Sequence, residues 1–364
     1  MKHLFLAFIS FFLLSNIYAQ EPDGYYDDAQ GLTGSELKTA LFHIISSHTA
    51  ISYDDIWNAF QSTDKKSDGT VWDIYSNCTY HFGTDQCGSY GGECDCYNRE
   101  HSFPKSWFND ASPMYTDLFH IYPSDGYVNG RRSNYPYGEV SNPTYTSSNG
   151  CKLGPNTYGS YTGTVFEPAD EYKGDLARSY FYMVTCYEDK VAGWEANASG
   201  ADAMLNGTTY PCFEDWALQM LLEWNNEDPV SQKEIDRNNA IYNIQGNRNP
   251  FIDHPEYVCM IWVDTCNVTS TYTIENNMKL SNFYNPETHH IIFYVNSSQT
   301  PLQNINISVY NTMGDEIYNN NFDNTSEYHT SGEIPINNNV SSQLLIVKYL
   351  LNDKTVITKK IMVY

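Results

Sequence analysis

Positive charge is scarce in this chain of 364 residues, in which 20 Lys and Arg face 44 Asp and Glu, for a net charge of −24. So few cations exclude a protein that binds nucleic acid through bulk electrostatic attraction. They do not exclude an enzyme that holds a phosphate with a few local cations and a metal ion. Aromatic residues are abundant, at 15%. They rule out a disordered chain, because so many rings must be buried or stacked.

Long apolar runs are lacking after the N-terminus. Lys2 precedes the apolar run Leu4–Leu14, and the small residue Ala19 follows it. This run is shorter than the ~20 residues that span a bilayer, and it has the order of a secretion signal, with a membrane anchor as the alternative. We therefore expect a signal peptide over residues 1–20 and a secreted, extracellular protein with no membrane span.

A second CxxC-type pair is also lacking. Cys94 and Cys96, with Cys87 nearby, could ligate zinc, but an exported chain makes disulfide bonds the favoured interpretation. The total of nine cysteines is odd, so at least one thiol stays free or pairs between molecules. The sequence leaves the connectivity open.

Cys, Arg and Trp are all absent beyond residue 270. This break in composition predicts two domains, over residues 21–272 and 282–364. The second contains short alternating apolar runs at residues 289–295, 305–310, 344–350 and 356–364. Runs of period two that are separated by turn residues predict a small antiparallel β-sandwich.

The first domain has the pattern of a mixed α+β fold. Thr33 and Glu36 have capping-box spacing ahead of an apolar helical repeat, and Ser231 and Glu234 have the same spacing after Pro229. Apolar residues over 213–224 recur at i, i+3, i+4, i+7 and predict an amphipathic helix. Residues 70–165 are rich in Gly, Tyr, Asn and Pro, and such irregular stretches usually carry function.

Chemically active side chains concentrate in Tyr97–Phe108 and Thr116–Val140. Hydrolysis of a phosphodiester needs a base for water, a counter-charge for phosphate and help for the leaving oxygen. His101 has a pKa suited to a general base, while Glu100 and Asn129 offer hard oxygen ligands of the kind that Mg²⁺ accepts. A lone Glu-His pair is more often structural, so spacing alone is a weak signal.

A plausible geometry brings these residues together. We expect Glu100 and His101 to end a strand, with a bend before Pro104 that turns both side chains toward one cleft. Asp125 can cap a helix, which would place Asn129 one turn beyond it on a face that looks back at the strand.

These two stretches resemble the endonuclease I family, secreted nucleases of the His-Me finger (ββα-metal) superfamily. Further matching stretches are Val165–Glu188, Leu221–Tyr242 and Gln245–Val258, and the resemblance spans about Thr33 to Trp262. It implies a His-Me finger nuclease domain in which His101 is the general base. It also implies that Glu100 and Asn129 hold one divalent ion, Mg²⁺ first, with Ca²⁺ or Mn²⁺ as alternatives.

The chain departs from the family pattern in two places. Many relatives carry His or Asn at the position of Phe119, beside His120, which puts the local support of the site in doubt although activity is expected to survive. The family's leaving-group arginine has no aligned counterpart between His101 and Asp117. The candidate phosphate-binding arginines, for each of which an internal ion pair is an equal alternative, are Arg99, Arg131, Arg132, Arg178 and Arg248.

The C-terminal segment resembles the sorting domain of type IX secretion, through Asn285-Pro286 before a strand, the stretch Val309–Asn319 and a closing strand rich in Lys and Val. The usual Gly-Ile-Tyr is replaced at Gln343, and composition alone equally allows an adhesive or carbohydrate-binding module. The sequence therefore predicts a secreted, monomeric, metal-dependent endonuclease that cleaves DNA, and also RNA, with little sequence preference. The alternative is a non-catalytic binding protein that retains the fold.

Overall fold

The structure is a computed structural model that describes residues 21–263, 278–285, 289–297, 302–327, 329–336, 343–352 and 355–363. The expected signal peptide and the expected boundary at residue 272 lie outside these ranges. Within them, none of the helices has the length and apolar character that a membrane crossing requires.

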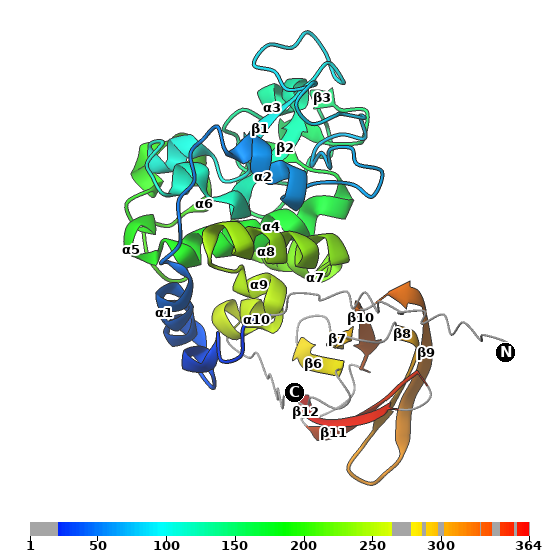
Figure 1. Cartoon of the computed structure of the whole chain (residues 1–364). Coiled ribbons are helices and arrows are strands. Elements are labelled where there is room, and N and C mark those ends of the chain that lie inside the picture. Colours follow the sequence, from blue (N-terminus) through cyan, green and yellow to red (C-terminus); the bar gives the residue numbers. More distant parts are fainter. Residues whose placement is uncertain are drawn as a thin grey trace, which may run out of the picture.

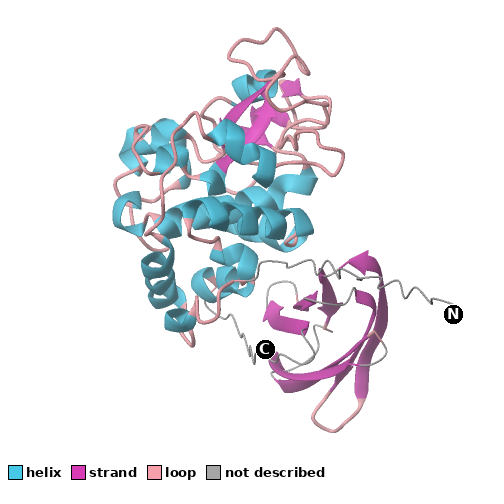
Figure 2. Cartoon of the chain, viewed as in Figure 1, coloured by secondary structure: helices cyan, strands magenta, loops and turns pink. Residues whose placement is uncertain are grey.

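The first part of the chain is mixed α and β, as the sequence predicts (Figures 1 and 2). Its helices are α1 (Gly34–Ile45), α2 (Ile56–Thr63), α3 (Gly126–Arg132), α4 (Lys173–Cys186), α5 (Glu188–Val191), α6 (Ser199–Met204), α7 (Asp215–Glu227), α8 (Gln232–Gln245), α9 (Pro250–Asp253) and α10 (Glu256–Trp262). Its strands are β1 (Tyr97–His101), β2 (Ile121–Asp125), β3 (Tyr145–Thr146), β4 (Lys152–Pro155) and β5 (Thr164–Glu167). β1 pairs with β2, and β3, β4 and β5 form a second antiparallel sheet in that order.

Helix α4 is the centre of this part. All 14 of its residues are buried, and it packs against α1, α7 and α9. Its buried charges are paired, as burial requires: Lys173 Nζ lies 3.1 Å from a Glu167 carboxylate oxygen, and Arg178 binds Glu234. The predicted capping box of α8 at Ser231 is confirmed, whereas Thr33 makes no side-chain cap at α1.

The second part consists of strands alone. They are β6 (Met278–Asn285), β7 (His290–Ser297), β8 (Leu302–Tyr310), β9 (Glu316–Glu327), β10 (His329–Pro335), β11 (Gln343–Leu351) and β12 (Thr355–Val363). They form two antiparallel sheets of order β10-β7-β6 and β12-β11-β8-β9, whose inward apolar residues share one core. β6 begins at Met278, four residues before the boundary expected at residue 282.

Candidate active site

The candidate active site is built on two antiparallel strands and the helix that follows them. In the register of β1 and β2, Glu100 faces Tyr122 and Asn98 faces Ser124. β1 ends at His101, and the chain bends directly afterwards, as expected. Figure 1 shows β1, β2 and α3 together at one end of the helical part.

Asp125 joins the second strand to the helix. Its Oδ1 accepts hydrogen bonds from the backbone N–H groups of Tyr127 at 2.8 Å and Val128 at 3.0 Å, which satisfies donors that the first turn of a helix leaves unpaired. Its Oδ2 accepts from the Tyr80 hydroxyl at 2.7 Å. The cap fixes where α3 begins, and Asn129 therefore stands one turn along it, as the sequence predicts.

Glu100 is a buried carboxylate with one oxygen in use. The residue is only 3% exposed. Its Oε1 accepts a hydrogen bond from the Tyr75 hydroxyl at 2.8 Å and forms an ion pair with Arg132 at 2.9 Å. Burial raises the pKa of Glu100, while Arg132 and the hydrogen bond from Tyr75 oppose that rise. Oε2 accepts no hydrogen bond from any residue that the structure describes, and so remains available as a ligand oxygen.

Arg132, at the end of α3, connects the helix to the end of β1. Besides its ion pair with Glu100, it donates from Nη1 to the His101 carbonyl at 2.9 Å and from Nη2 to the Ser102 carbonyl. One guanidinium thus holds the Glu100 side chain and the backbone of His101 in a fixed relation. This bidentate use of arginine gives geometric precision that a lysine could not.

Asn129 and Asn98 form the other half of the site. The Asn129 amide nitrogen donates to Asn98 Oδ1 at 2.7 Å, and Ser124 Oγ donates to the same oxygen at 3.3 Å. The amide of Asn129 is therefore oriented with its own Oδ1 unused within the described structure. Asn98 and Glu100 are two positions apart on β1 and share one face, about 6.6 Å apart along the strand. Two hard oxygen donors, on Glu100 and Asn129, consequently lie on this face.

His101 is held in one tautomer. Its Nε2 lies 3.1 Å from the backbone carbonyl of Tyr115. A carbonyl only accepts hydrogen bonds, so Nε2 carries the proton and Nδ1 carries the lone pair. The ring stacks on Tyr115 and on Tyr53, with centroids at 5.2 and 6.0 Å. Burial, together with the neighbouring His120, lowers the pKa of His101 to about 3, so the ring is neutral at physiological pH.

Phe119, where the chain departs from the expected family pattern, is part of the hydrophobic core. Phe119 packs on Tyr182, with ring centroids at 4.6 Å. His120 instead supports the site: its ring centroid lies 5.5 Å from that of His101, and its Nε2 lies 2.7 Å from the Met114 carbonyl. Phe119 therefore packs in the hydrophobic core, while His120 is the member of the pair that contacts His101.

The candidate phosphate-binding arginines separate into two groups. Arg132, Arg178 and Arg248 are buried and bind Glu100, Glu234 and Asp253 respectively, so for them the alternative of an internal ion pair holds. Arg99 is half-buried, 3.7 Å from the exposed Asp54, and Arg131 is exposed. Of the five candidates, these two are the ones that are not buried.

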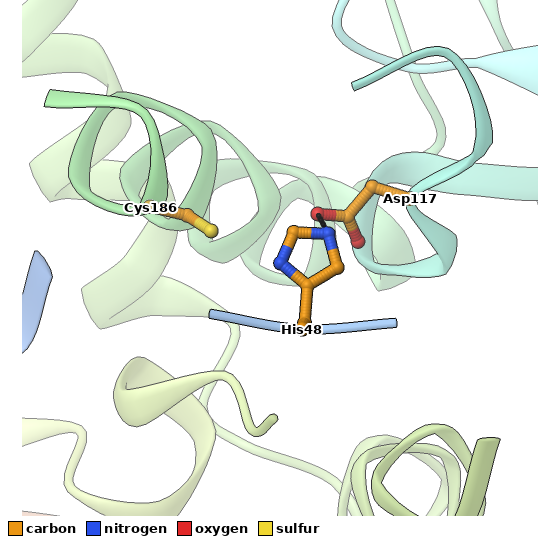
Figure 3. Close-up of side chains that lie close together, drawn as sticks. All are labelled: His48, Asp117 and Cys186. Atoms are coloured by element: carbon orange, nitrogen blue, oxygen red, sulfur yellow. Dashed lines mark ion pairs between the residues drawn. The ribbon is translucent and has the colours of Figure 1, made fainter. Parts of the chain in front are cut away.

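A second cluster with metal-binding residue types lies in the interior. Ligand atoms of His48, Asp117 and Cys186 lie within 4.8 Å of one another (Figure 3). Asp117 already accepts hydrogen bonds from the hydroxyls of Tyr182 at 2.8 Å and Tyr187 at 2.7 Å. Burial, and then the charge of Asp117, raise the pKa of Cys186, so its thiol stays protonated. These contacts favour a packed hydrogen-bond network over a metal centre.

The cysteines settle the choice between zinc and disulfide bonds. Cys78 is bonded to Cys94 and Cys87 to Cys96, so the expected disulfide bonds are confirmed and the zinc alternative is wrong. Cys259 is also disulfide-bonded. Three free thiols are buried, those of Cys151, Cys186 and Cys212.

Several residues of the site could not be found from sequence. Tyr75 reaches it from an irregular segment and Tyr115 from the short 3-10 helix Met114–Thr116, and neither carries a local sequence signal. Asn98 does have a usable sequence signal, since it lies two positions before Glu100 and so shares a strand face with it.

Most of the α/β part of the chain matches known proteins. The sequence model of the family described as Endonuclease I matches residues 33–256. An extracellular ribonuclease of Bacillus subtilis is 38% identical over 249 residues, which cover 66% of this chain and 79% of that protein. A periplasmic deoxyribonuclease of Aeromonas hydrophila is 27% identical over 175 residues, covering 46% of this chain and 56% of that protein. An endonuclease-1 of Buchnera aphidicola is likewise 27% identical over 175 residues, covering 48% and 57%.

Proposed function

The chain belongs to the endonuclease I family and is an endonuclease, and on this premise we propose that it is an exported, metal-dependent enzyme of the His-Me finger type. The observation that carries the proposal is the β1–β2–α3 unit, which presents Glu100, His101 and Asn129 from one strand end and one helix turn. The alternative of a non-catalytic binding protein has no support in these residues, since all three are retained.

We assign His101 as the general base. Its Nε2–H is held by the Tyr115 carbonyl, which directs Nδ1, with its lone pair, outward to receive a proton from water. Because burial keeps the imidazole neutral, it needs no deprotonation before it acts. Stacking on Tyr115, and on Tyr53 beside it, keeps the ring plane of His101 fixed, so that the ring is oriented before substrate arrives.

The donor set fits a hard divalent cation. Glu100 Oε2 and Asn129 Oδ1 are the two oxygens left free by the hydrogen bonds described above, and an ion held by one carboxylate and one amide suits the water-retaining habit of Mg²⁺. When bound, such an ion supplies positive charge to the phosphate and to the leaving oxygen. Members of the family are generally metal-dependent. Mg²⁺ is our first choice, with Ca²⁺ or Mn²⁺ as alternatives.

Arg99 and Arg131 are the proposed phosphate contacts. Arg99 follows Asn98 on β1, and Arg131 lies two residues beyond Asn129 on α3. Arg99 shares its strand face with His101 and lies over the Tyr53 ring on which His101 also stacks, while Arg131 is carried by the same helix as Asn129. Charge-assisted hydrogen bonds from guanidinium to phosphate are short and strong, which lets a strongly acidic chain hold a polyanion at one place.

DNA and RNA are both proposed substrates. The relatives are named as extracellular ribonucleases and as periplasmic or extracellular deoxyribonucleases. The groups proposed for the site are a general base, two metal ligands and two arginines. All of them would act on the sugar-phosphate backbone of a substrate and not on its nucleobases. Little sequence preference is expected from such contacts.

Export is proposed for the mature chain. The relatives' names include extracellular and periplasmic nucleases, and residues 1–20 have the order of a signal peptide. The β-sandwich from Met278 onward is proposed as a sorting domain for type IX secretion machinery, with an adhesive or carbohydrate-binding module as the alternative. The nuclease is proposed to act as a monomer.

A nicking assay on supercoiled plasmid, run beside a structured RNA, tests the proposed function. Cleavage should stop in EDTA and return when Mg²⁺ is restored. The variant Glu100→Gln keeps one ligand oxygen but removes the negative charge, so its cleavage should require a higher Mg²⁺ concentration than that of the wild type. Cleavage that ignores EDTA, or no cleavage with any of the three ions, would reject the metal-dependent assignment.

A further inference from the structure

Helix α3, which bears the proposed metal ligand Asn129, also carries an aromatic and cationic surface, which we call the α3 cluster: Tyr90, Tyr127, Arg131 and Tyr145. Tyr127 lies between the other two tyrosines, with ring centroids 6.3 Å from Tyr90 and 6.2 Å from Tyr145 in edge-to-face geometry. The Arg131 guanidinium carbon lies 4.8 Å from the Tyr127 ring centroid and 5.4 Å from that of Tyr145. The cluster is continuous from the loop to the helix and on to β3.

The cluster is built by specific sequence features. Tyr90 lies in a loop that the Cys78–Cys94 and Cys87–Cys96 disulfide bonds fasten. The Tyr90 ring packs against the α3 backbone at Gly126 and Gly130, where a larger residue would collide with it. A Cβ at Gly126 would lie 2.7 Å from Tyr90 Cδ1. The two glycines, one helical turn apart, therefore make room for an aromatic ring beside Asn129.

Tyr90 remains 38% exposed although it is seated in this way. Arg131 is exposed too. Among the arginines, which all lie in described parts of the chain, Arg131 is the one without a carboxylate at ion-pair distance. The partners of the others are Asp54 for Arg99, Glu100 for Arg132, Glu234 for Arg178, Asp64 for Arg237 and Asp253 for Arg248. A strongly acidic chain thus leaves its most available guanidinium over two tyrosine rings beside the helix that carries Asn129.

We propose that the α3 cluster stacks unpaired bases and makes the enzyme select single-stranded nucleic acid over duplex. This inference rests on the proposed function and names its substrate class. Tyrosine faces and guanidinium planes stack on bases whatever their identity. In a duplex the faces of the bases are already covered by their neighbours, so only an unpaired base can use the cluster. The cluster reaches the site through Tyr90, because a Cβ at Gly126 would lie 2.7 Å from the Tyr90 ring and 3.4 Å from Nδ2 of Asn98, the hydrogen-bond partner of Asn129.

The charge of the whole chain supports the same conclusion. A net charge of −24 means that neutralisation of phosphates, which gives duplex binders most of their affinity, contributes little here. Stacking does not depend on the charge of the protein. A single strand therefore gains from this surface an attraction that a duplex lacks.

Binding measurements test the proposal without depending on cleavage. The probes are a fluorescein-labelled oligothymidylate of eight nucleotides, the same strand with abasic sites, and a hairpin duplex of equal charge. All are titrated with His101→Ala protein in Mg²⁺. Tyr127→Leu and Tyr145→Leu in that background should raise the Kd for the single strand about 5- to 150-fold, since stacking contributes ~1–3 kcal/mol per base. The Kd values for the abasic strand and the hairpin should stay unchanged.

Two controls keep the outcome decisive. Tyr135→Leu removes a tyrosine that is 40% exposed and outside the cluster, and should leave all Kd values unchanged. Tyr127→Phe retains the ring and should retain most of the single-strand affinity. Equal losses for single strand and hairpin, or no loss for either, would overturn the proposal. Failure of the proposed function would show separately, as an absence of Mg²⁺-dependent cleavage by the wild-type protein.

Discussion

At the scale of single residues, the two adjacent arginines at the end of α3 have opposite environments. Arg132 is 1% exposed and holds Glu100 together with the carbonyls of His101 and Ser102. Arg131 lies at the surface. Removing one partner of a buried ion pair leaves the other charge without compensation, so Arg132→Met should lower the free energy of unfolding by ~3–5 kcal/mol. Urea denaturation measures this.

The matched control for that prediction is Arg131→Met, which should leave the unfolding midpoint in urea nearly unchanged. Because Glu100 would no longer be stranded as a buried charge, the double variant Glu100→Gln/Arg132→Met should recover part of the loss. Additive effects of the two substitutions would contradict the ion pair as the reason for the instability.

The sequence is informative about residues whose chemistry and spacing coincide. Glu100 at a strand end and Asn129 one turn after the capping Asp125 follow from local rules, and the structure has this local arrangement. Tyr115, which fixes the tautomer of His101, could not be predicted, because it acts through its backbone carbonyl, which any residue type would supply. The ion-pair partners of the buried arginines could not be predicted either, since the sequence does not show which carboxylate lies beside each guanidinium in the fold.

At the scale of elements, the loop before β1 depends on covalent links. Its two disulfide bonds span sequence separations of 16 and 9 residues, and closing such loops stabilises by roughly 3 kcal/mol each in the chain-entropy account. The double variant Cys87→Ser/Cys96→Ser should therefore unfold more easily by about that amount, measured by calorimetry or urea. Dithiothreitol should destabilise the wild type more than the variant. An unchanged unfolding midpoint in both comparisons would contradict this role of the loop.

Element types were largely predictable, and their ends and pairings were not. The helical repeat over 213–224 became α7, and the alternating runs at 305–310 and 344–350 became parts of β8 and β11. β6, β9 and β10 were missed. In β9 a run of Asn, Asp and Thr within Glu316–Glu327 hides the alternation. Strand order within each sheet depends on contacts distant in sequence, which no local pattern encodes.

At the scale of the whole molecule, one buried histidine makes stability depend on pH. His254 Nδ1 lies 3.1 Å from Glu256 and Nε2 lies 3.5 Å from Glu21. Burial disfavours the charged ring, but the two carboxylates outweigh it and raise the pKa of His254 to about 10. A folded pKa above the unfolded value of ~6.5 contributes stability that is complete below pH 6.5 and is lost as the pH rises toward 10.

The variant Glu256→Gln should accordingly show a smaller fall in Tm between pH 6.5 and 10 than the wild type. Glu36→Gln, at an exposed position on α1, should keep the wild-type slope. Thermal melts across this pH range make the measurement, and parallel curves for all three proteins would refute the assignment to His254.

The two parts of the chain have separate cores. One runs from Tyr26 to Trp262 and the other from Leu280 to Val363. A cut near the boundary predicted from sequence would fall inside or next to β6, so a chain that ends after Val263 is the better truncation. Turnover of a short single strand should be unchanged by it. Lost export would support the sorting role, and a raised KM on long DNA with normal export would support a binding module. Lost turnover would contradict separate cores.

The most direct test of the account is the rate of His101→Ala in saturating Mg²⁺ on a short oligonucleotide, because His101 is the proposed base. Removing a general base costs ~10²–10⁴ in rate, so we expect a loss of that size, with Tm and Mn²⁺ affinity unchanged. His81→Ala, at an exposed histidine, should keep the wild-type rate. If His101→Ala retained more than about a tenth of the wild-type rate, the loss would be too small for a general base, and the central assignment would be contradicted.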